Sequence, residues 1–314
     1  MRSSAVIAIS TVMFLAASAI TAQTQPATTA SASRHVEPVP PADWFEDGKI
    51  RFVFRSDDAG FCHASNMALE RLLTEGTVSA VSVLVNTGWL DETVDILKKH
   101  PTVSVGVHVC LNSEWTPYKW GPVLPAKEVP SLVDEWGHFF GTRKDLLAHN
   151  PNMDEVEKEI RAQVDLALRK GLKISYLDHH MGAAVTTPEM AKRFEKVARE
   201  HKFGISRWLG ETQGPVVYSV LPEQKSEFLI SEMRKITKPG VYLVVCHTLV
   251  KTPEVAVLKD LNVTGPRNMA DYRQAELDML CNPKLKEVIA EKGIEVIGYD
   301  ALRERFYERM TAPQ

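Results

Sequence analysis

The stretch IRFVFRSDDAGFCHASNMALERLLTEG, residues 50–76, sets the pattern that the rest of the chain repeats. Its apolar, β-rich start at 50–56 predicts a strand, and the amphipathic run at 66–76 predicts a helix that ends at a glycine. Asp57 and Asp58 stand between the two elements. This acidic pair fits either a helix cap or a metal site, in which one carboxylate binds the ion and the other handles a proton.

Strands and helices are expected to alternate along the whole chain. The expected strands span 50–56, 78–86, 103–112, 173–178, 203–208, 241–247 and 294–299. The expected helices span 66–76, 91–100, 154–171, 188–201, 223–237, 270–281 and 284–292. This alternation predicts a mainly parallel sheet covered by helices. A folded part of about 270 residues favours a TIM-barrel-like α/β fold over a doubly wound sheet.

The amino-terminal residues are not expected to belong to this fold. Residues 1–22 combine an early arginine, an apolar stretch and terminal small residues, which is typical of a secretory signal peptide. A membrane anchor is the alternative. Residues 23–42 are rich in Pro, Ala, Ser and Thr and are expected to form a flexible linker. A single folded domain would then span 43–312, in a protein exported to the periplasm or secreted.

The charge balance argues against nucleic acid and anionic membranes as partners. Lys and Arg number 37 and Asp and Glu 40, for a net charge of −3 without a basic block. A small-molecule substrate is therefore expected, with no membrane contact after signal cleavage, and homo-oligomer formation stays open. Four scattered cysteines are too few for a disulfide scaffold and are expected to be buried thiols. A Cys62–Cys110 bridge and a cysteine ligand to zinc are the alternatives.

Polar residues gather at the carboxyl ends of the expected strands. They are Asp57, Asp58, His108, Asp178, His179, His180 and His247. Each fits an ordinary role when taken alone, such as a buried core histidine or a surface pair. In an α/β barrel, however, the carboxyl ends of the strands form one face, so all seven residues are expected to converge. Carboxylates and imidazoles in this number are what a catalytic divalent metal needs.

Several motifs, taken together, resemble the YdjC-like carbohydrate deacetylases, which include the chitooligosaccharide deacetylases. The motifs are SDDAG, SVLVN, GVHVCLN, SLVDEWGHF, YLDHHMG and YRQAELDML, and the resemblance covers about residues 50–300. It implies a deformed β/α barrel that removes N-acetyl groups from amino sugars or short oligosaccharides. It also implies that Asp58, His108 and His180 bind one divalent metal and that Asp57 is the catalytic base. Mixed Asp and His ligands suit zinc best, with magnesium or another divalent transition metal as the alternative.

Two motifs depart from the family pattern. His179 stands where the pattern LDSHMG has serine, so it is expected either to support the ligands, as Asp178 does, or to compete for the metal. The family motif CHPG is CHTL here, which retains His247. His247 is expected to protonate the leaving amine or to stabilise the oxyanion.

Residues 112–153 have no clear periodicity, and long loops of this kind are usually functional. Trp115, Tyr118 and Trp120 within them are expected to stack on sugar rings, with core packing as the alternative. The resemblance also places Arg273 at the substrate site. Two other functions stay open: a metal hydrolase of the same fold that acts on another amide or ester, and a sugar-binding module with a decayed site.

Overall fold

The computed structural model describes residues 44–262 and 265–311, and its centre is a parallel sheet. The strands of this sheet are β1 (Ile50–Ala59), β2 (Ala80–Val83), β3 (Ser104–Val109), β5 (Ile174–His179), β6 (Gly204–Ile205), β7 (Thr212–Gln213), β8 (Gly240–His247) and β10 (Glu295–Val296). Their order is β6-β5-β3-β2-β1-β8-β7, and β10 pairs with the first residues of β1. Within the described residues the edge strands β6 and β7 do not pair with each other, so the sheet does not close and forms a half-barrel. The predicted deformed (β/α) barrel is confirmed.

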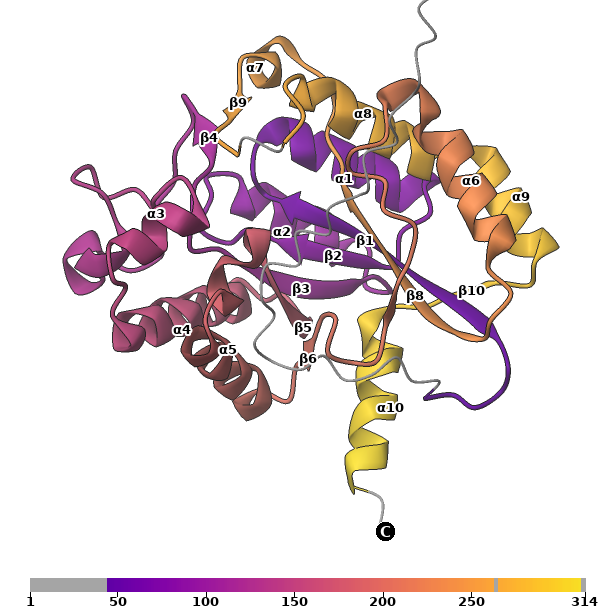
Figure 1. Ribbon diagram of the computed structural model, residues 1–314, viewed down its shortest axis with the longest axis horizontal. Helices are drawn as coiled ribbons and strands as arrows, with labels where there is room; N and C mark the ends of the chain where they lie inside the picture. Colours follow the sequence, from indigo (N-terminus) through magenta and orange to yellow (C-terminus); the bar gives the residue numbers. More distant parts are fainter. Residues whose placement is uncertain (1–43, 263–264, 312–314) are drawn as a thin grey trace, which may run out of the picture. The chain divides into compact units, whose positions relative to one another are not determined.

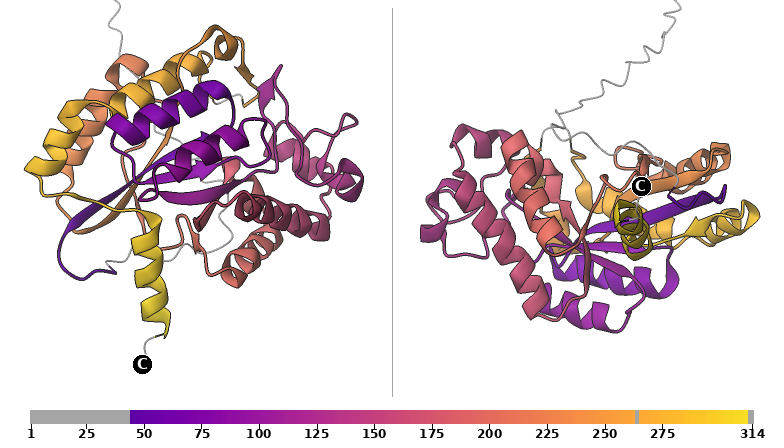
Figure 2. Two further views of the ribbon diagram at one scale, coloured as in Figure 1. Left: turned by 180° about the vertical axis from the view of Figure 1, so that it is seen from behind. Right: turned by 90° about the horizontal axis from the view of Figure 1, so that it is seen from below.

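Helices pack around this half-barrel (Figure 1). They are α1 (His63–Glu75), α2 (Leu90–Lys98), α3 (Arg143–Ala148), α4 (Met153–Arg169), α5 (Pro188–Glu200), α6 (Lys225–Lys235), α7 (Pro253–Ala256), α8 (Met269–Leu280), α9 (Pro283–Glu291) and α10 (Tyr299–Thr311). Short 3-10 helices are η1 (Ala126–Glu128), η2 (Pro130–Leu132), η3 (His180–Val185) and η4 (Pro222–Gln224). The views in Figures 1 and 2 show α6 beside α8 and α9, and α4 beside α5.

Most expected elements are present, with ends that differ by a few residues. The expected strands 203–208 and 294–299 are reduced to two residues each. The helix α10 was not predicted, because its sequence has only a short apolar stripe. That stripe, Tyr299, Leu302 and Phe306, packs in one cluster with Val53 of β1 and Leu243 of β8. The helix thus fills the hollow of the half-barrel.

The two faces of β1 pack against different parts of the molecule. Phe52 and Phe54 pack in a cluster with residues of α6, α8 and α9. Val53 faces the α10 side, and alternation along a strand places Arg55 and Asp57 on that same inner face. The inner face therefore has an apolar floor and a charged end, and the charged end lies at the carboxyl termini of the strands.

Close packing around Gly106 of β3 explains why the GVH motif begins with glycine. A Cβ atom at this position would lie 2.4 Å from the ring of Tyr176 on the neighbouring strand β5. Only glycine leaves room for that ring, which stacks on Tyr299 of α10 with the ring centroids 4.1 Å apart. The strand thus packs tightly just before it reaches His108.

The predicted signal peptide, residues 1–22, and the linker, residues 23–42, lie outside the described residues, as do the outermost residues of the predicted domain, 43 and 312. Within the described part of the chain, no helix has both the length and the apolar character that crossing a membrane requires. A short antiparallel pair, β4 (Trp115–Thr116) with β9 (Lys259–Asp260), joins the segment 112–153 to the residues before α8.

Candidate active site

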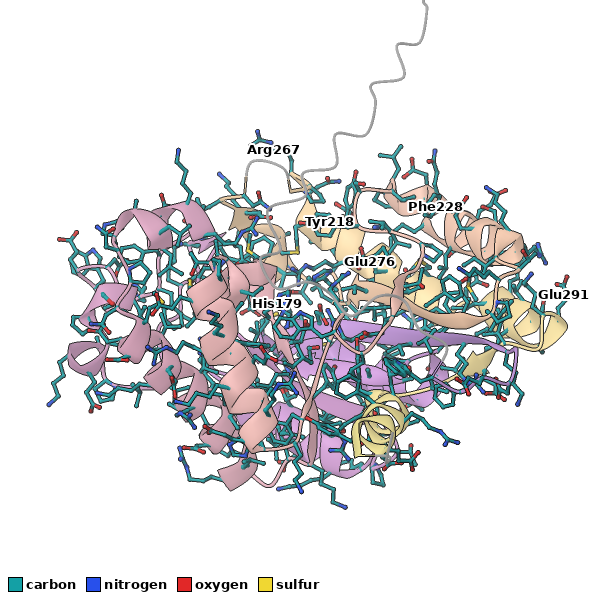
Figure 3. The ribbon with its side chains drawn as sticks, turned by 60° about the horizontal axis from the view of Figure 1, so that its bottom comes forward. His179, Tyr218, Phe228, Arg267, Glu276 and Glu291 are labelled. Atoms are coloured by element: carbon teal, nitrogen blue, oxygen red, sulfur yellow. The ribbon has the colours of Figure 1, made fainter. Side chains whose placement is uncertain are left out.

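A cavity of about 310 Å³ opens at the carboxyl ends of the central strands. All seven polar residues expected to converge there line it, together with Trp115 and Arg273. Figure 3 labels three side chains around this cavity, His179 from the end of β5, Tyr218 from the segment before α6 and Glu276 from α8. Residues about 200 positions apart in the sequence thus meet in one place.

A bulge at the end of β1 brings both aspartates into the cavity. Consecutive strand residues normally point to opposite faces, so Asp57 and Asp58 should diverge. The pairing of β1 with β2 shifts register between Ser56 and Ala59, and Asp58 has a left-handed backbone with φ of 66°. Bulges of this kind redirect side chains near active sites. The alternative role as a helix cap is wrong for both aspartates, since the residue that precedes α1 is Cys62.

Three buried atoms form a triangle at one end of the cavity. Asp58 Oδ1 lies 3.3 Å from His108 Nε2 and 3.3 Å from His180 Nδ1, and the two nitrogens are 3.3 Å apart. These residues form a possible ligand cluster. Neither oxygen of Asp58 accepts a well-angled hydrogen bond from the described residues, although both are buried. Arg273 compensates Oδ2 at 2.8 Å, whereas Oδ1 faces only the two imidazole nitrogens, so the donor set around Oδ1 fits a metal ion.

Carboxylates lie behind both histidines of this triangle. Asp178 Oδ2 is 2.8 Å from His108 Nδ1, and the two residues are paired in register across β3 and β5. Glu114 Oε2 is 2.8 Å from His180 Nε2. Such contacts hold an imidazole in the orientation that a metal requires. The sequence predicted the role of Asp178 but missed Glu114, whose signal was its place six residues after His108 in an aperiodic segment.

Charged neighbours set the protonation of the triangle. Burial raises the pKa of Asp58, but Arg273, whose Nη1 lies 2.8 Å from Asp58 Oδ2, and the two histidines outweigh this effect and hold the pKa well below its usual range. Burial lowers the pKa of His108, yet nearby carboxylates raise it to about 9. Burial also lowers the pKa of His180, but Glu114 and other neighbours hold it well above its usual range. The site is therefore strongly attractive to positive charge, and a metal ion competes with protons for it.

Asp57 is held apart from the triangle by an arginine. Arg55 donates from Nε and Nη2 to the two oxygens of Asp57, at 2.7 Å each, and its Nη2 is also 2.8 Å from Asp178 Oδ2. Asp57, His108 and Asp178 form a second possible ligand cluster. Because the guanidinium already compensates both of these carboxylates, the first cluster is the better metal site.

His247 lies beside Asp57 as its register partner across β1 and β8. Its backbone N–H donates to Glu276, a residue of α8. Glu276 also pairs with the fully buried Lys225, whose ammonium group donates to the carbonyl oxygens of Val217 and Tyr218. Burial lowers the pKa of His247, and its Nδ1 has no hydrogen-bond partner within 44–262 and 265–311. Nδ1 is buried 3.9 Å from Glu276 Oε2, and the side chain lines the cavity.

The sequence matches a known family. The profile of the family described as "YdjC-like protein" matches residues 51–291. The chain belongs to the YdjC-like family. It is similar to a carbohydrate deacetylase from Brevibacillus brevis, with 26% identity over 264 residues that cover 81% of this chain and all of the relative. It is also similar to a carbohydrate deacetylase from Thermus thermophilus, with 28% identity over 285 residues, 83% of this chain and 96% of the relative.

The fold of a solved structure agrees with this membership. A crystal structure from Enterococcus faecalis, described as that of a proposed cellobiose-phosphate cleavage protein, superposes with a TM-score of 0.66 at 20% identity. The match covers 81% of this chain and 99% of the other. The resemblance predicted from the motifs is confirmed for the family and for the fold.

This YdjC-like chain places His179, the departure from the family pattern, at the cavity wall. Its side chain packs edge-on to Phe194 with the ring centroids 6.0 Å apart, and its Nδ1 lacks a partner in the described residues. Burial lowers the pKa of His179 to about 4, so the imidazole is neutral near pH 7. It belongs to neither ligand cluster.

The three aromatic residues of the segment 112–153 lie in different environments. Trp115 lines the cavity, and its ring centroid is 5.2 Å from the guanidinium carbon of Arg273. Trp120 is buried and donates from Nε1 to the carbonyl oxygen of Asn112. Tyr118 packs edge-on to the ring of Phe61. Tyr118 and Trp120 lie outside the lining of the cavity, and Trp115, which borders it, is itself only 2% exposed, so all three aromatic residues serve mainly in core packing.

All four cysteines carry free thiols, so the alternative of a Cys62–Cys110 bridge is wrong. Cys110 approaches the carbonyl oxygen of Asn112 at 3.0 Å. Burial raises the pKa of Cys110 to about 11, which keeps it protonated and unsuited to metal binding. No cysteine belongs to a ligand cluster in the described part of the chain.

Proposed function

We propose that this YdjC-like protein is a metal-dependent hydrolase that removes N-acetyl groups from amino sugars or short oligosaccharides. The observation that carries the proposal is the triangle of Asp58, His108 and His180 beside an aspartate that does not belong to it, Asp57. The carbohydrate deacetylases to which the chain is similar extend over four fifths of it, including all of these residues. Acetamide hydrolysis needs a Lewis acid and a base side by side, which is what this cavity offers.

The spacing of the donor atoms supports zinc. Ligands about 2.0–2.1 Å from a tetrahedral zinc ion lie about 3.3–3.4 Å from one another. The three donor atoms are separated by 3.3 Å each. Octahedral magnesium at the same bond length requires about 2.9 Å between adjacent ligands. When bound, the ion would polarise the acetamide carbonyl and lower the pKa of a coordinated water.

Asp57 is the proposed general base. Its carboxylate lies at the cavity wall, and Arg55 holds both of its oxygens in a two-bond clamp that fixes their direction. A general base must lie within hydrogen-bonding reach of the attacking water, and a carboxylate held in one position can meet this requirement. His247, beside Asp57 on the neighbouring strand, lines the cavity and is the proposed proton donor to the leaving amine.

Three residues that line the cavity hold the ligands in place. Asp178 and Glu114 orient the two histidines, and Arg273 lies against the outer oxygen of Asp58. Trp115, which is almost fully buried, packs on Arg273 and holds it at the cavity wall. The leader-like residues 1–22 support the proposal that this activity is exported.

Metal content and acetate release together test this function. The purified protein is expected to contain about one zinc ion per chain, and His180→Ala is expected to lose it together with acetate release from N-acetylated chitooligosaccharides. A protein that stays metal-free after zinc loading but still binds sugar would replace the hydrolase with a binding module. Metal binding with release only from other amides or esters would replace the substrate class.

A further inference from the structure

One of the arginines that line the cavity, Arg143, has no side-chain partner within the described residues. Four arginines line the cavity, and they are Arg55, Arg143, Arg207 and Arg273. Arg55 and Arg273 are paired with aspartates of the site. The guanidinium of Arg207 donates to Gln213. Within the described ranges, the side chain of Arg143 makes neither an ion pair nor a hydrogen bond, although it is partly buried.

The position of Arg143 is electrostatically unfavourable for the fold itself. It is the first residue of α3, directly after Thr142, whose Oγ1 caps the helix by accepting from the N–H of Asp145. The amino end of a helix carries partial positive charge, so a cation there destabilises the helix slightly. A solvated surface arginine would turn into water, whereas this one lines the wall of the cavity.

Arg143 lies next to the turn that carries a proposed metal ligand. Its Nη1 would be 3.3 Å from a Cβ atom at Gly182, two residues after His180. Gly182 has a φ of 74°, and its lack of a side chain leaves the guanidinium open to the cavity. A substrate whose acetamide reaches the triangle therefore has this cation within the same small cavity.

We infer that the cavity takes an amino sugar that carries a carboxylate and that Arg143 binds this carboxylate. The inference rests on the proposed deacetylase function and names its substrate class. A planar guanidinium donates two parallel hydrogen bonds to a carboxylate and carries one matching charge. A phosphate ester is the alternative anion for a guanidinium, and the binding comparison separates the two.

Matched sugars and matched variants test this assignment. N-acetylglucosamine is the neutral ligand, and N-acetylmuramic acid and N-acetylglucosaminuronic acid are its carboxylated counterparts. Lys144→Gln is the control for Arg143→Gln, since Lys144 is the next residue of α3, is exposed and carries the same charge. Binding is measured by calorimetry in an Asp57→Asn background, so that turnover does not consume the ligand, and kcat/KM is measured with Asp57 intact.

The protein with Arg143 intact is expected to bind at least one carboxylated sugar more tightly than the neutral sugar. Arg143→Gln is expected to weaken that sugar's binding about 10- to 100-fold, as typical for a lost charged hydrogen-bond pair, with little change for the neutral sugar. Arg143→Lys should recover part of the loss, because it keeps the charge without the fork. Lys144→Gln should change the binding of neither the carboxylated nor the neutral sugar.

Three outcomes overturn the inference. They are equal weakening of neutral and carboxylated sugars by Arg143→Gln, no effect of this variant on either, and tighter Arg143-dependent binding of N-acetylglucosamine 6-phosphate than of both carboxylated sugars. Failure of the proposed function is distinguishable from these results. It appears as the absence of acetate release from every sugar, and the calorimetric comparison still decides the role of Arg143.

Discussion

The cavity joins two regions that are built differently. The strand ends, residues 55–58, 106–108 and 176–180, are fixed by register across a parallel sheet, which pairs His108 with Asp178 and extends β1 to Asp57 beside His247. The insert, residues 112–153, is mostly irregular and contributes Glu114, Trp115 and Arg143. The strand ends supply the proposed chemistry, and the insert supplies its support and a wall for substrate.

The insert is held in place by a few buried polar contacts. Glu159 of α4 accepts hydrogen bonds from the backbone N–H groups of Val123 and Leu124. Gln163, one turn later, bonds the backbone of Cys110 through both its oxygen and its nitrogen. Burial raises the pKa of Glu159, which reflects how dry this anchor is. A substitution that disturbs the insert should therefore move a supporting residue, while the sheet and the ligands that it carries stay in place.

The largest effect is expected within the strand ends, between two adjacent aspartates. Asp58→Asn should lose the metal and nearly all activity. Asp57→Asn should retain the metal and lower kcat about 10²- to 10⁴-fold, the usual contribution of a general base. Elemental analysis and acetate release measure both. Equal metal loss in the two variants would contradict the division of roles.

The next effect compares one supporting carboxylate from each region. Glu114→Gln and Asp178→Asn each remove the charge behind a histidine of the triangle. Each is expected to lower metal affinity about 10- to 100-fold, because an outer carboxylate orients the imidazole and strengthens it as a ligand. Competition with a chelator measures the affinity. If only Asp178→Asn lowered metal affinity, Glu114 of the insert would not support the metal site.

A smaller effect separates two tryptophans of the insert. Trp115→Phe truncates a buried side chain that also borders the cavity and packs on Arg273, so it is expected to lower Tm and, by displacing Arg273, to raise KM several-fold. Trp120→Phe, in the core, is expected to lower Tm with KM unchanged, because it removes a buried hydrogen bond to Asn112. A rise of KM in the second variant alone would reverse their assigned roles.

The smallest effect on activity is expected from the anchor of the insert. Glu159→Gln leaves a buried amide N–H₂ facing one of the two backbone donors and should lower the free energy of unfolding by about 1–3 kcal/mol. Asp165→Asn, exposed on the same helix, is the control and should change it by less than about 0.5 kcal/mol. Denaturant titration measures both. A large loss of activity at full stability would show that the insert tunes the site directly.

Particular residues mark how far the sequence could predict this site. Asp57, Asp58, His108, His180 and His247 each follow or end an apolar strand, and the rule that parallel strand ends meet was enough to bring them together. Glu114 was missed because nothing periodic surrounds it. Trp120 was placed with the substrate because an aromatic side chain in a loop has the same local sequence whether it lines a cavity or is buried.

The sequence by itself determined the strand–helix alternation, the family and the set of charged residues at the strand ends, because periodicity and order along the chain are local properties. The family resemblance already implied the choice of Asp58 over Asp57 as the ligand, and the tertiary structure supplies its physical reason. That choice depends on the bulge before Ala59 and on the clamp of Arg55 around Asp57. Only the tertiary structure decided that α10 fills the half-barrel and that Arg143 lines the cavity, since both depend on packing between segments far apart in the sequence.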